Sequence, residues 1–321
     1  MPKRVTTQNL VITVAAGYRE EQIRCFLASL RHFSPDTSLR LIVDRVNLEF
    51  QEAVRAWFPS CSFHLLPPAP LRDFARNRKW ARSVLKRLTR WSRSPKLGQQ
   101  LLTINFLRHL VIRDLLAEWN LSQANILLCD SRDVVFQADP FAGEWPPLWT
   151  CEEDKRIEEC GENSFWLKRA GGEAALQQAK HQPIVCAGVF GGQLDRIRLY
   201  LEQSSKIVEQ LATRIPLMVG DQGIHNYLVR LRPDLGFTVL PNGCRLAANV
   251  GYTKPADLII ENNHVRLRNH DEVPAILHQY DRHPQVVALI QSRWANAKPG
   301  QPVDPPGFAS ADSVTSWEQN R

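Results

Sequence analysis

Two aspartates stand where a buried strand is predicted to end, and carboxylates at such a place can hold a metal ion. The apolar run 126–128 (Ile-Leu-Leu) is typical of a strand covered on both faces of a sheet, and Asp130 and Asp133 follow it closely. In open α/β sheets, ligands bind beyond the carboxyl ends of strands, so these hard oxygen ligands indicate a divalent cation that holds a phosphate. The alternative is an ordinary turn, in which Asp133 pairs with a nearby arginine.

The acids must be positioned by the elements that the apolar pattern predicts. Strands are expected at 10–16, 39–43, 62–66, 126–128 and 184–192. Helices are expected at 20–33, 49–58 and 99–119. Strands that alternate with helices imply a mostly parallel sheet with helices on its faces, so the predicted fold class is α/β. We expect one domain over residues 9–295, a tail over 1–8 and a disordered tail, rich in Pro, Gly, Ser and Asp, over 296–321.

Small residues follow the first predicted strand. Ala15 and Gly17 would let a ligand approach the backbone closely, and Tyr18 could stack on a base. No G-x-G-x-x-G follows either of the first two predicted strands, which argues against a dinucleotide-binding fold of that type.

Composition limits the class of protein. The chain has 321 residues, of which 44% are hydrophobic, and it contains no apolar run of about 18 residues that would predict a membrane span. The N-terminus does not read as a signal peptide. Seven cysteines, an odd number without C-x-x-C spacing, are expected to be reduced core residues of a cytoplasmic protein, and we expect no zinc site.

Positive charge is concentrated in the segment 72–96, which carries ten Lys and Arg residues against one acid. Its apolar residues fall at helical spacing: Trp80, Val84, Leu88 and Trp91. A basic amphipathic helix with aromatic residues could dock on an anionic membrane surface, which would make the protein peripheral on the inner face of the membrane. The alternative is a solvated basic face whose apolar stripe packs on the domain. We expect no nucleic acid partner, because no other nucleic-acid-binding motif occurs.

The order of these segments resembles the nucleotide-sugar-dependent glycosyltransferases of the GT-A fold. Their metal motif, Asp-x-Asp, follows a buried strand and precedes an apolar run and another Asp, as in the segment 130–141 with its later Asp139. This chain departs by one residue. When the valines are aligned, Asp133 falls on the last Asp of the motif and Ser131 on the first, so Asp130 would supply that carboxylate from one position earlier. The resemblance covers about residues 8 to 285 and implies a single Rossmann-like GT-A domain.

The resemblance implies a metal-dependent transfer of a sugar from a nucleotide-diphosphate sugar to the hydroxyl of a glycan or lipid-linked acceptor. Asp130, Asp133 and His278, which follows a late apolar run, would bind Mn²⁺ or Mg²⁺. An imidazole beside two carboxylates suits Mn²⁺ better than Mg²⁺. A lone late histidine is otherwise a structural residue.

Three further polar residues are assigned to the donor by the same resemblance. Asp44, after the second predicted strand, would bond the base or the ribose. Arg108, on the helix before the metal segment, would point at the phosphates, and Arg282 could bind the departing diphosphate. An ordinary arginine on a helix face is the alternative for Arg108.

Ala187 and Gly188 lie in the predicted strand 184–192 and would face the donor sugar, although Cys186 replaces the Asn that commonly precedes them. A glycine inside a strand marks a close backbone approach, and a tight contact between helix and sheet would also explain it.

Asp221 and Gln222 match an Asp-Gln pair of the resembling enzymes. Asp221 would accept the acceptor's proton or stabilise positive charge on the sugar, while Gln222 would orient the sugar. Helix capping alone could also explain Asp221. The acidic stretch 152–159 could hold acceptor hydroxyls or balance the basic segment.

Two other functions remain open at this level. A nucleotidyltransferase has a similar sheet and metal-bound carboxylates, but it commonly has a Lys-containing loop after the first strand, and residues 15–19 contain no Lys. A non-catalytic protein that binds membranes or polyanions through residues 72–96 would not use Asp130 and Asp133. The stereochemistry of transfer stays undetermined.

Overall fold

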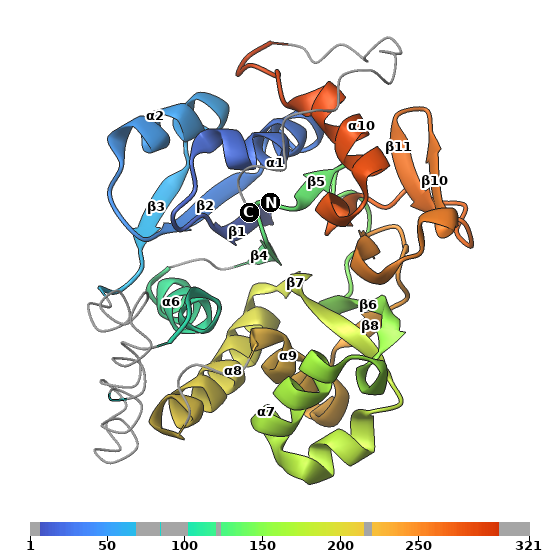
Figure 1. Ribbon diagram of the computed structural model, residues 1–321. Helices are drawn as coiled ribbons and strands as arrows, with labels where there is room; N and C mark the ends of the chain where they lie inside the picture. Colours follow the sequence, from blue (N-terminus) through green and yellow to red (C-terminus); the bar gives the residue numbers. More distant parts are fainter. Residues whose placement is uncertain (1–6, 69–83, 85–101, 120–122, 215–219, 302–321) are drawn as a thin grey trace, which may run out of the picture.

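The apolar runs of the first half of the chain form parallel strands. In the computed structural model, residues 7–68, 84, 102–119, 123–214 and 220–301 are described. Four strands lie side by side in parallel: β3 (Ser62–Leu65), β2 (Ser38–Val43), β1 (Gln8–Val14) and β4 (Ala124–Cys129). Three helices alternate with them along the chain: α1 (Glu20–Phe33), α2 (Leu48–Trp57) and α6 (Ile104–Glu118). The first half of the chain therefore has the predicted α/β arrangement (Figure 1).

The second half completes this sheet with three strands, of which only β7 is reversed relative to β4. Three strands extend it beyond β4: β7 (Pro183–Gln193), β6 (Leu148–Arg156) and β8 (Thr238–Leu240). β7 runs antiparallel to both β4 and β6, whereas β8 is parallel to β6. The strand order is β3-β2-β1-β4-β7-β6-β8, and most of the pairings are parallel. The predicted mostly parallel α/β sheet is confirmed.

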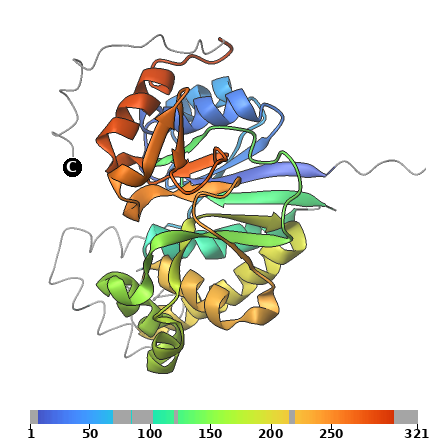
Figure 2. The same ribbon diagram turned by 90° about the vertical axis from the view of Figure 1, so that its right-hand side faces the viewer.

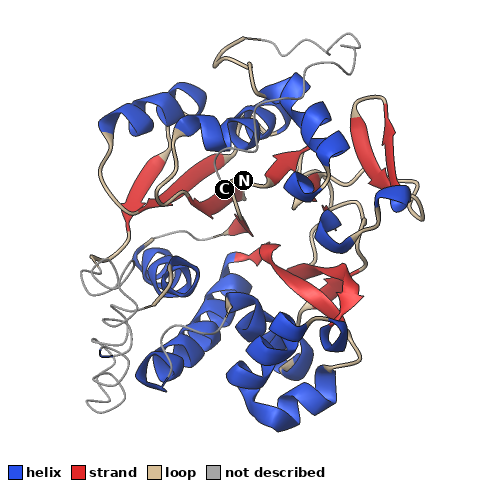
Figure 3. Cartoon of the chain, viewed as in Figure 1, coloured by secondary structure: helices blue, strands red, loops and turns tan. Residues whose placement is uncertain are grey.

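Immediately after β4, the chain enters a small three-stranded sheet. Its three strands, in spatial order, are β5 (Val134–Phe136), β12 (Ile276–His278) and β9 (Ala247–Asn249). β12 is antiparallel to β5 and parallel to β9. A separate hairpin consists of β10 (Leu258–Glu261) and β11 (His264–Leu267). The link between β4 and β5, which carries both predicted metal-binding acids, therefore joins the two sheets (Figure 3).

Helices cover both faces of the large sheet. The later helices are α7 (Gly161–Ala179), α8 (Leu194–Arg214), α9 (Asp221–Leu231) and α10 (Pro284–Trp294). Short 3-10 helices lie in the connecting segments: η1 (Ile157–Glu159), η2 (Pro233–Leu235), η3 (Val250–Tyr252), η4 (Pro255–Asp257) and η5 (Tyr280–Arg282). Helices α1, α2 and α10 lie on one side with the small sheet, and α6, α7, α8 and α9 lie on the other (Figures 1 and 2).

The alternation of side chains along β1 fills two cores. Val11 packs in the core that contains α1, α2 and the small sheet, whereas Leu10 and Ile12 pack in the core that contains α6 and α8. All three side chains are at most 1% exposed. Burial on both faces explains why the central strands read as continuous apolar runs.

Several details differ from the sequence-based predictions. On α6 the buried face includes Ile112 and Leu116, whereas Val111 and Leu115, predicted to point inward, are half-buried. The acidic stretch 152–159, for which no strand was predicted, begins inside strand β6. The basic segment 72–96, apart from Val84, and residues 302–321 of the predicted tail lie outside the described residues. Among the helices that the structure describes, none is long and apolar enough to cross a membrane.

Candidate metal and donor site

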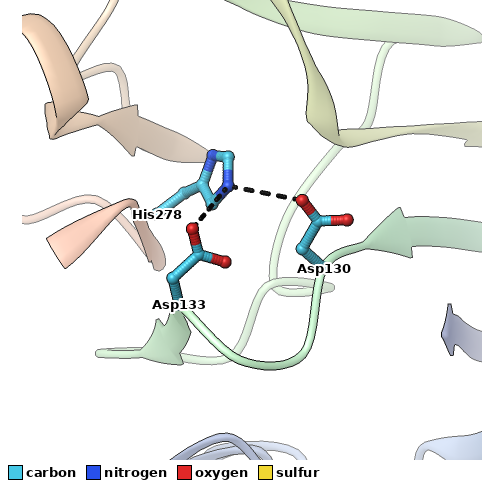
Figure 4. Close-up of side chains that lie close together, drawn as sticks. All are labelled: Asp130, Asp133 and His278. Carbon is cyan, nitrogen blue, oxygen red and sulfur yellow. Dashed lines mark ion pairs between the residues drawn. The ribbon is translucent and has the colours of Figure 1, made fainter. Parts of the chain in front are cut away.

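Asp130, Asp133 and His278 converge where the two sheets meet (Figure 4). Each offers one ligand atom, and these atoms lie within 4.8 Å of one another. The Nε2 atom of His278 is 3.8 Å from Asp130 Oδ2 and 3.7 Å from Asp133 Oδ2. The antiparallel register of β12 and β5 sets His278 opposite Val134, the residue after Asp133. Strand pairing therefore brings the late histidine to the acids.

The side chains of Ser131 and Asp130, the two candidates for the first acid position of the motif, point in different directions. Ser131 is 1% exposed, and its hydroxyl donates to the Val14 carbonyl at 2.9 Å, so this side chain points into the sheet. Asp130, one position earlier, donates its backbone N–H to the Gly188 carbonyl at 2.8 Å and presents its carboxylate to the cluster. Asp130, and not Ser131, therefore lies with Asp133 and His278.

Gly188 leaves room for two members of the cluster. A Cβ atom at this position would lie 2.5 Å from His278 Cε1 and 2.8 Å from Asp130 Oδ2. Real Cβ contacts are about 3.5 to 4.0 Å, so a side chain here would displace a proposed ligand. The close backbone approach predicted for Gly188 is present, and it is an approach of β7 to Asp130 and His278.

His278 is held by groups that the sequence analysis did not assign to the site. It is 1% exposed, and its Nδ1 atom is 3.0 Å from Asn249 Oδ1 and 3.3 Å from Cys186 Sγ. A hydrogen bond from Nδ1 to Asn249 leaves Nε2 to face the two carboxylates, which is the usual arrangement behind a metal-binding histidine. Burial lowers the pKa of His278, but Cys186, Asp133 and Asp130 outweigh it and raise the pKa well above its ordinary value.

Arg108 ties this cluster to the start of α9. Its Nη1 donates to Asp130 Oδ1 at 2.7 Å, and its Nη2 donates to the Ala187 carbonyl at 3.0 Å and also to Asp221 Oδ2. Its side chain is 14% exposed. Burial lowers the pKa of Arg108, but Asp221 and Asp130 outweigh the burial and raise it, so the guanidinium stays charged. Arg108, the arginine predicted to bind phosphate, is in the site. In this structure it donates hydrogen bonds to Asp130, Ala187 and Asp221.

The pKa values of the three acids of the site are shifted in different directions. Burial would raise the pKa of Asp130, but Arg108 and His278 outweigh it and lower that pKa to about 2. Burial raises the pKa of Asp133 despite the opposing charge of His278. Burial likewise raises the pKa of Asp221 despite Arg108. Asp130 is therefore the most firmly ionised of the three.

Asp221 is the first residue of α9, and Gly220 occupies the N-cap position without a side-chain cap. The Asp221 Oδ1 atom accepts the backbone N–H of Gln222 at 3.0 Å, and the side chain is 9% exposed. Capping by Asp221 is therefore not the arrangement in this structure, and its carboxylate is engaged by Arg108 instead.

Gln222 brings two further polar residues to the site. Its Nε2 donates to Asn163 Oδ1 at 3.1 Å and lies 3.5 Å from Glu153 Oε1. Glu153 is 2% exposed, its Oε2 is a buried oxygen with no hydrogen-bond partner among the described residues, and burial raises its pKa. The sequence analysis recognised an acidic stretch at this point of the chain but did not single out Glu153.

The turn after β1 meets the end of β2. Gly17 has φ +77°, a left-handed conformation that favours glycine, and its N–H donates to Asp44 Oδ1 at 2.9 Å. Ala15 is 2% exposed and donates to the Ile42 carbonyl at 2.8 Å. Burial raises the pKa of Tyr18, and the charges of Arg132, Asp130 and Asp133 also act on this group.

Arg282 lies at the exposed rim of the site, next to Tyr252. Its side chain is exposed, its guanidinium carbon is 5.5 Å from the Tyr252 ring centroid, and its Nη1 donates to the Gly251 carbonyl at 3.4 Å. Its charge opposes the rise in the pKa of Glu153 that burial causes. A polar cavity of about 260 Å³ adjoins the same Tyr252; its lining includes Asp154, Lys254 and Arg268.

Comparison with known proteins found solved structures of similar outline. No family model and no curated protein matches the chain. The galactosyltransferase LgtC, solved with donor and acceptor sugar analogues, is 17% identical over 88% of this chain and 95% of its own, with a TM-score of 0.48. An active-site mutant of LgtC is 16% identical over the same shares, with a TM-score of 0.49. The glycosyltransferase GlyE of Streptococcus pneumoniae TIGR4 is 14% identical over 85% of this chain and 54% of its own, with a TM-score of 0.46.

Proposed function

We propose that this protein is a metal-dependent glycosyltransferase of the GT-A type, which moves a sugar from a nucleotide-diphosphate sugar to an acceptor hydroxyl. The observation that carries the proposal is the cluster of Asp130, Asp133 and His278 at the carboxyl end of β4, with Arg108 bonded to its first acid. Ligands of open α/β sheets bind at this edge. The cluster and the arginine together suit a ligand that is itself a diphosphate.

The residues of the cluster fit a divalent cation. Two carboxylates and one imidazole are a donor set suited to Mn²⁺, and Gly188 keeps the space beside them free of a side chain. Mn²⁺ or Mg²⁺ held there would act as a Lewis acid on the diphosphate leaving group. Asn249 and Cys186 would fix the orientation of His278.

The donor nucleotide is proposed to lie along the ends of β1 and β2. Gly17 holds Asp44 by one carboxylate oxygen, Oδ1, and the second oxygen is available to a base or ribose. Tyr18, a partly buried residue in the turn after β1, would stack on the base. The carboxyl ends of β1 and β2 lie on the same edge of the sheet as the carboxyl end of β4, which Asp130 and Asp133 follow. A nucleotide diphosphate could lie along this edge, with Arg108 beside its phosphates.

The sugar end of the donor is proposed to face Ala187, Gly188 and Asp221. A buried carboxylate whose pKa is raised is suited to accept a proton from an acceptor hydroxyl or to stabilise positive charge on the sugar. Gln222, held by Asn163, would orient the sugar. Arg282 would meet the departing diphosphate from the rim.

The acceptor is proposed to enter on the side of Glu153. The unpartnered Oε2 of Glu153 can accept a hydroxyl, and the polar cavity beside Tyr252 can hold a further sugar of a glycan. Membrane attachment, and with it a lipid-linked acceptor, rests only on the sequence of residues 72–96. Sedimentation with anionic vesicles at low salt tests that part separately.

Release of nucleoside diphosphate from a panel of nucleotide sugars tests the proposal. With Mn²⁺ and a mixture of simple sugar acceptors, we expect release from one donor class, and at least tenfold slower release by Asp133→Asn and by Asp221→Asn, which corresponds to about 1.4 kcal/mol of barrier. Asp114→Asn is the matched control, because Asp114 is an exposed acid paired with Arg113 on the same helix. Equal rates in all variants would contradict the assignment.

A further inference from the structure

Two cysteines that are far apart in the sequence meet behind the candidate site. Cys151 lies in β6, and Cys244 lies in the segment that leads from β8 to β9. Their Sγ atoms are 3.6 Å apart and form a hydrogen bond. A disulfide has an S–S length of about 2.05 Å, so the two sulfur atoms need to approach by about 1.5 Å. Among the described residues, no second pair of cysteine thiols makes such a hydrogen bond.

The two thiols differ in access. Cys151 is fully buried, whereas Cys244 is half-buried and can be reached by a small reagent. The segment that carries Cys244 is a short turn, in which Gly243 has φ +80° and donates its N–H to the Ala247 carbonyl at 3.2 Å. A turn can shift more readily than a central strand. Cys244 is therefore the thiol that can move and be attacked first.

The surroundings also favour Cys244 as the reactive thiol. The hydrogen bond with Cys151 lowers the pKa of Cys244 to about 6 against the opposing effect of burial. Burial raises the pKa of Cys25 to about 11 and of Cys61 to about 12. A lowered pKa favours the thiolate of Cys244, which is the nucleophilic form.

We propose that Cys151 and Cys244 are a disulfide-forming pair that is oxidised by a low-molecular-weight disulfide such as glutathione disulfide. The Cys244 thiolate attacks one sulfur of glutathione disulfide, so that a mixed disulfide forms and one glutathione thiolate leaves. Cys151 then attacks Cys244 Sγ, its proton passes to the departing glutathione, and the second glutathione leaves. Two electrons move from the cysteine pair to the oxidant, and two molecules of glutathione are formed.

The disulfide would reinforce the hydrogen-bonded frame around Asn249, which contacts His278. Asn249, which contacts His278 through Oδ1, donates from Nδ2 toward the Cys151 carbonyl at 3.4 Å. Asn242, two residues before Cys244, accepts the Asn249 backbone N–H at 2.7 Å and donates to its carbonyl at 3.1 Å. A disulfide between Cys151 and Cys244 would join the two sides of this frame covalently. The inference stands independently of the proposed glycosyl transfer.

Peptide mapping under non-reducing conditions tests the proposal on the full-length protein. After equilibration with glutathione disulfide at pH 7.5, we expect the Cys151–Cys244 cross-link to be the main product and to disappear with dithiothreitol. Cys151→Ser should accumulate glutathione on Cys244, because the resolving thiol is gone. Cys244→Ser should leave Cys151 unmodified. Cys25→Ser is the matched control, since Cys25 is also half-buried, and it should form the same cross-link as the wild type.

Three results would overturn the proposal. One is a wild-type protein in which Cys244 stays as a stable mixed disulfide. The second is faster modification of another thiol, such as Cys61 or Cys160, than of Cys244. The third is a lower melting temperature for the oxidised protein than for the reduced protein, because a bond that fits the native fold does not destabilise it.

Discussion

Replacement of Gly188 by alanine tests whether the proposed metal ligands require a residue without a side chain at this position of β7. The added Cβ would be 2.5 Å from His278 Cε1, about 1 Å inside a normal contact. His278 is fully buried between Asn249 and Cys186, so its ring cannot retreat without breaking those contacts. The same Cβ would be 2.8 Å from Asp130 Oδ2.

The expected magnitude follows from the size of this overlap. Overpacking a well-packed site costs about 1 to 3 kcal/mol, and metal–ligand distances tolerate only about 0.2 Å. If the cost falls on the bound state, the dissociation constant for Mn²⁺ rises between about 5-fold and 150-fold. Titration of Mn²⁺ followed by electron paramagnetic resonance of the free ion measures this change directly, and urea unfolding measures the part of the cost that falls on folding.

Gly161→Ala is the matched control, because a Cβ at Gly161, the first residue of α7, would have no atom within 4 Å. We expect its Mn²⁺ affinity to equal that of the wild type and its stability to change by less than about 1 kcal/mol. A folded Gly188→Ala protein that binds Mn²⁺ as tightly as the wild type would refute the reasoning.

Three further predictions concern the surroundings of the cluster. Arg108→Met should lower the free energy of unfolding by about 3 to 5 kcal/mol in urea titrations, because it leaves the buried carboxylate of Asp221 and the partly exposed carboxylate of Asp130 without their cation. Arg113→Met, which removes surface pairs, should cost less than about 1 kcal/mol. Calorimetry should find Mn²⁺ binding unchanged in Ser131→Ala and at least tenfold weaker in Asp130→Asn; the reverse order would mean that the metal motif is read in the wrong register. Burial lowers the pKa of His225 to about 3 in the folded protein, whereas in the unfolded chain it is about 6.5. As the pH drops below about 6.5, the unfolded chain therefore binds a proton that the folded protein does not bind. The free energy of unfolding should fall by about 1.4 kcal/mol per pH unit in this range. In His225→Gln this part of the slope should be absent from unfolding curves at pH 7 and pH 5.5; an unchanged slope would assign the pH dependence to other groups.

Local patterns were sufficient for the elements that carry the acids. The helical spacing of 20–33 predicts α1 with its observed bounds, and the apolar run at 126–128 lies within β4. Asp130 and Gly188 could be singled out because each is unusual for its element: an acid directly after a buried strand, and a glycine within one. Both features depend on a few neighbouring residues, which is why the sequence reveals them.

Contacts across long stretches of chain could not be read in the same way. Arg108 and Asp221 are 113 residues apart, and Cys186 and His278 are 92 residues apart. Nothing in the local spacing specifies these pairs, because they depend on the order of strands in the sheet. Asn249 offered a faint signal, since it ends a short apolar strand as His278 does, and the two strands pair in parallel.

The acidic stretch shows why a local rule can mislead. Charged residues are depleted in strands, so Glu152 and Glu153 favour a loop prediction, yet both lie in β6. Glu152 accepts from Arg230 at 2.9 Å, and Glu153 faces Gln222 across the site. Partners supplied by α9 outweigh the low strand propensity, and those partners lie about 70 residues further along the chain.

Thermal stabilisation by nucleoside diphosphates tests the central claim most directly. The purified protein would be melted with a panel of nucleoside diphosphates, with and without Mn²⁺, alongside Asp133→Ala. We predict that one nucleotide raises the melting temperature only when Mn²⁺ is present, and that the effect disappears in Asp133→Ala, because stabilisation requires binding to the folded protein. No shift with any nucleotide, or a shift of equal size in Asp133→Ala, would contradict a metal-bridged donor site at Asp130, Asp133 and His278.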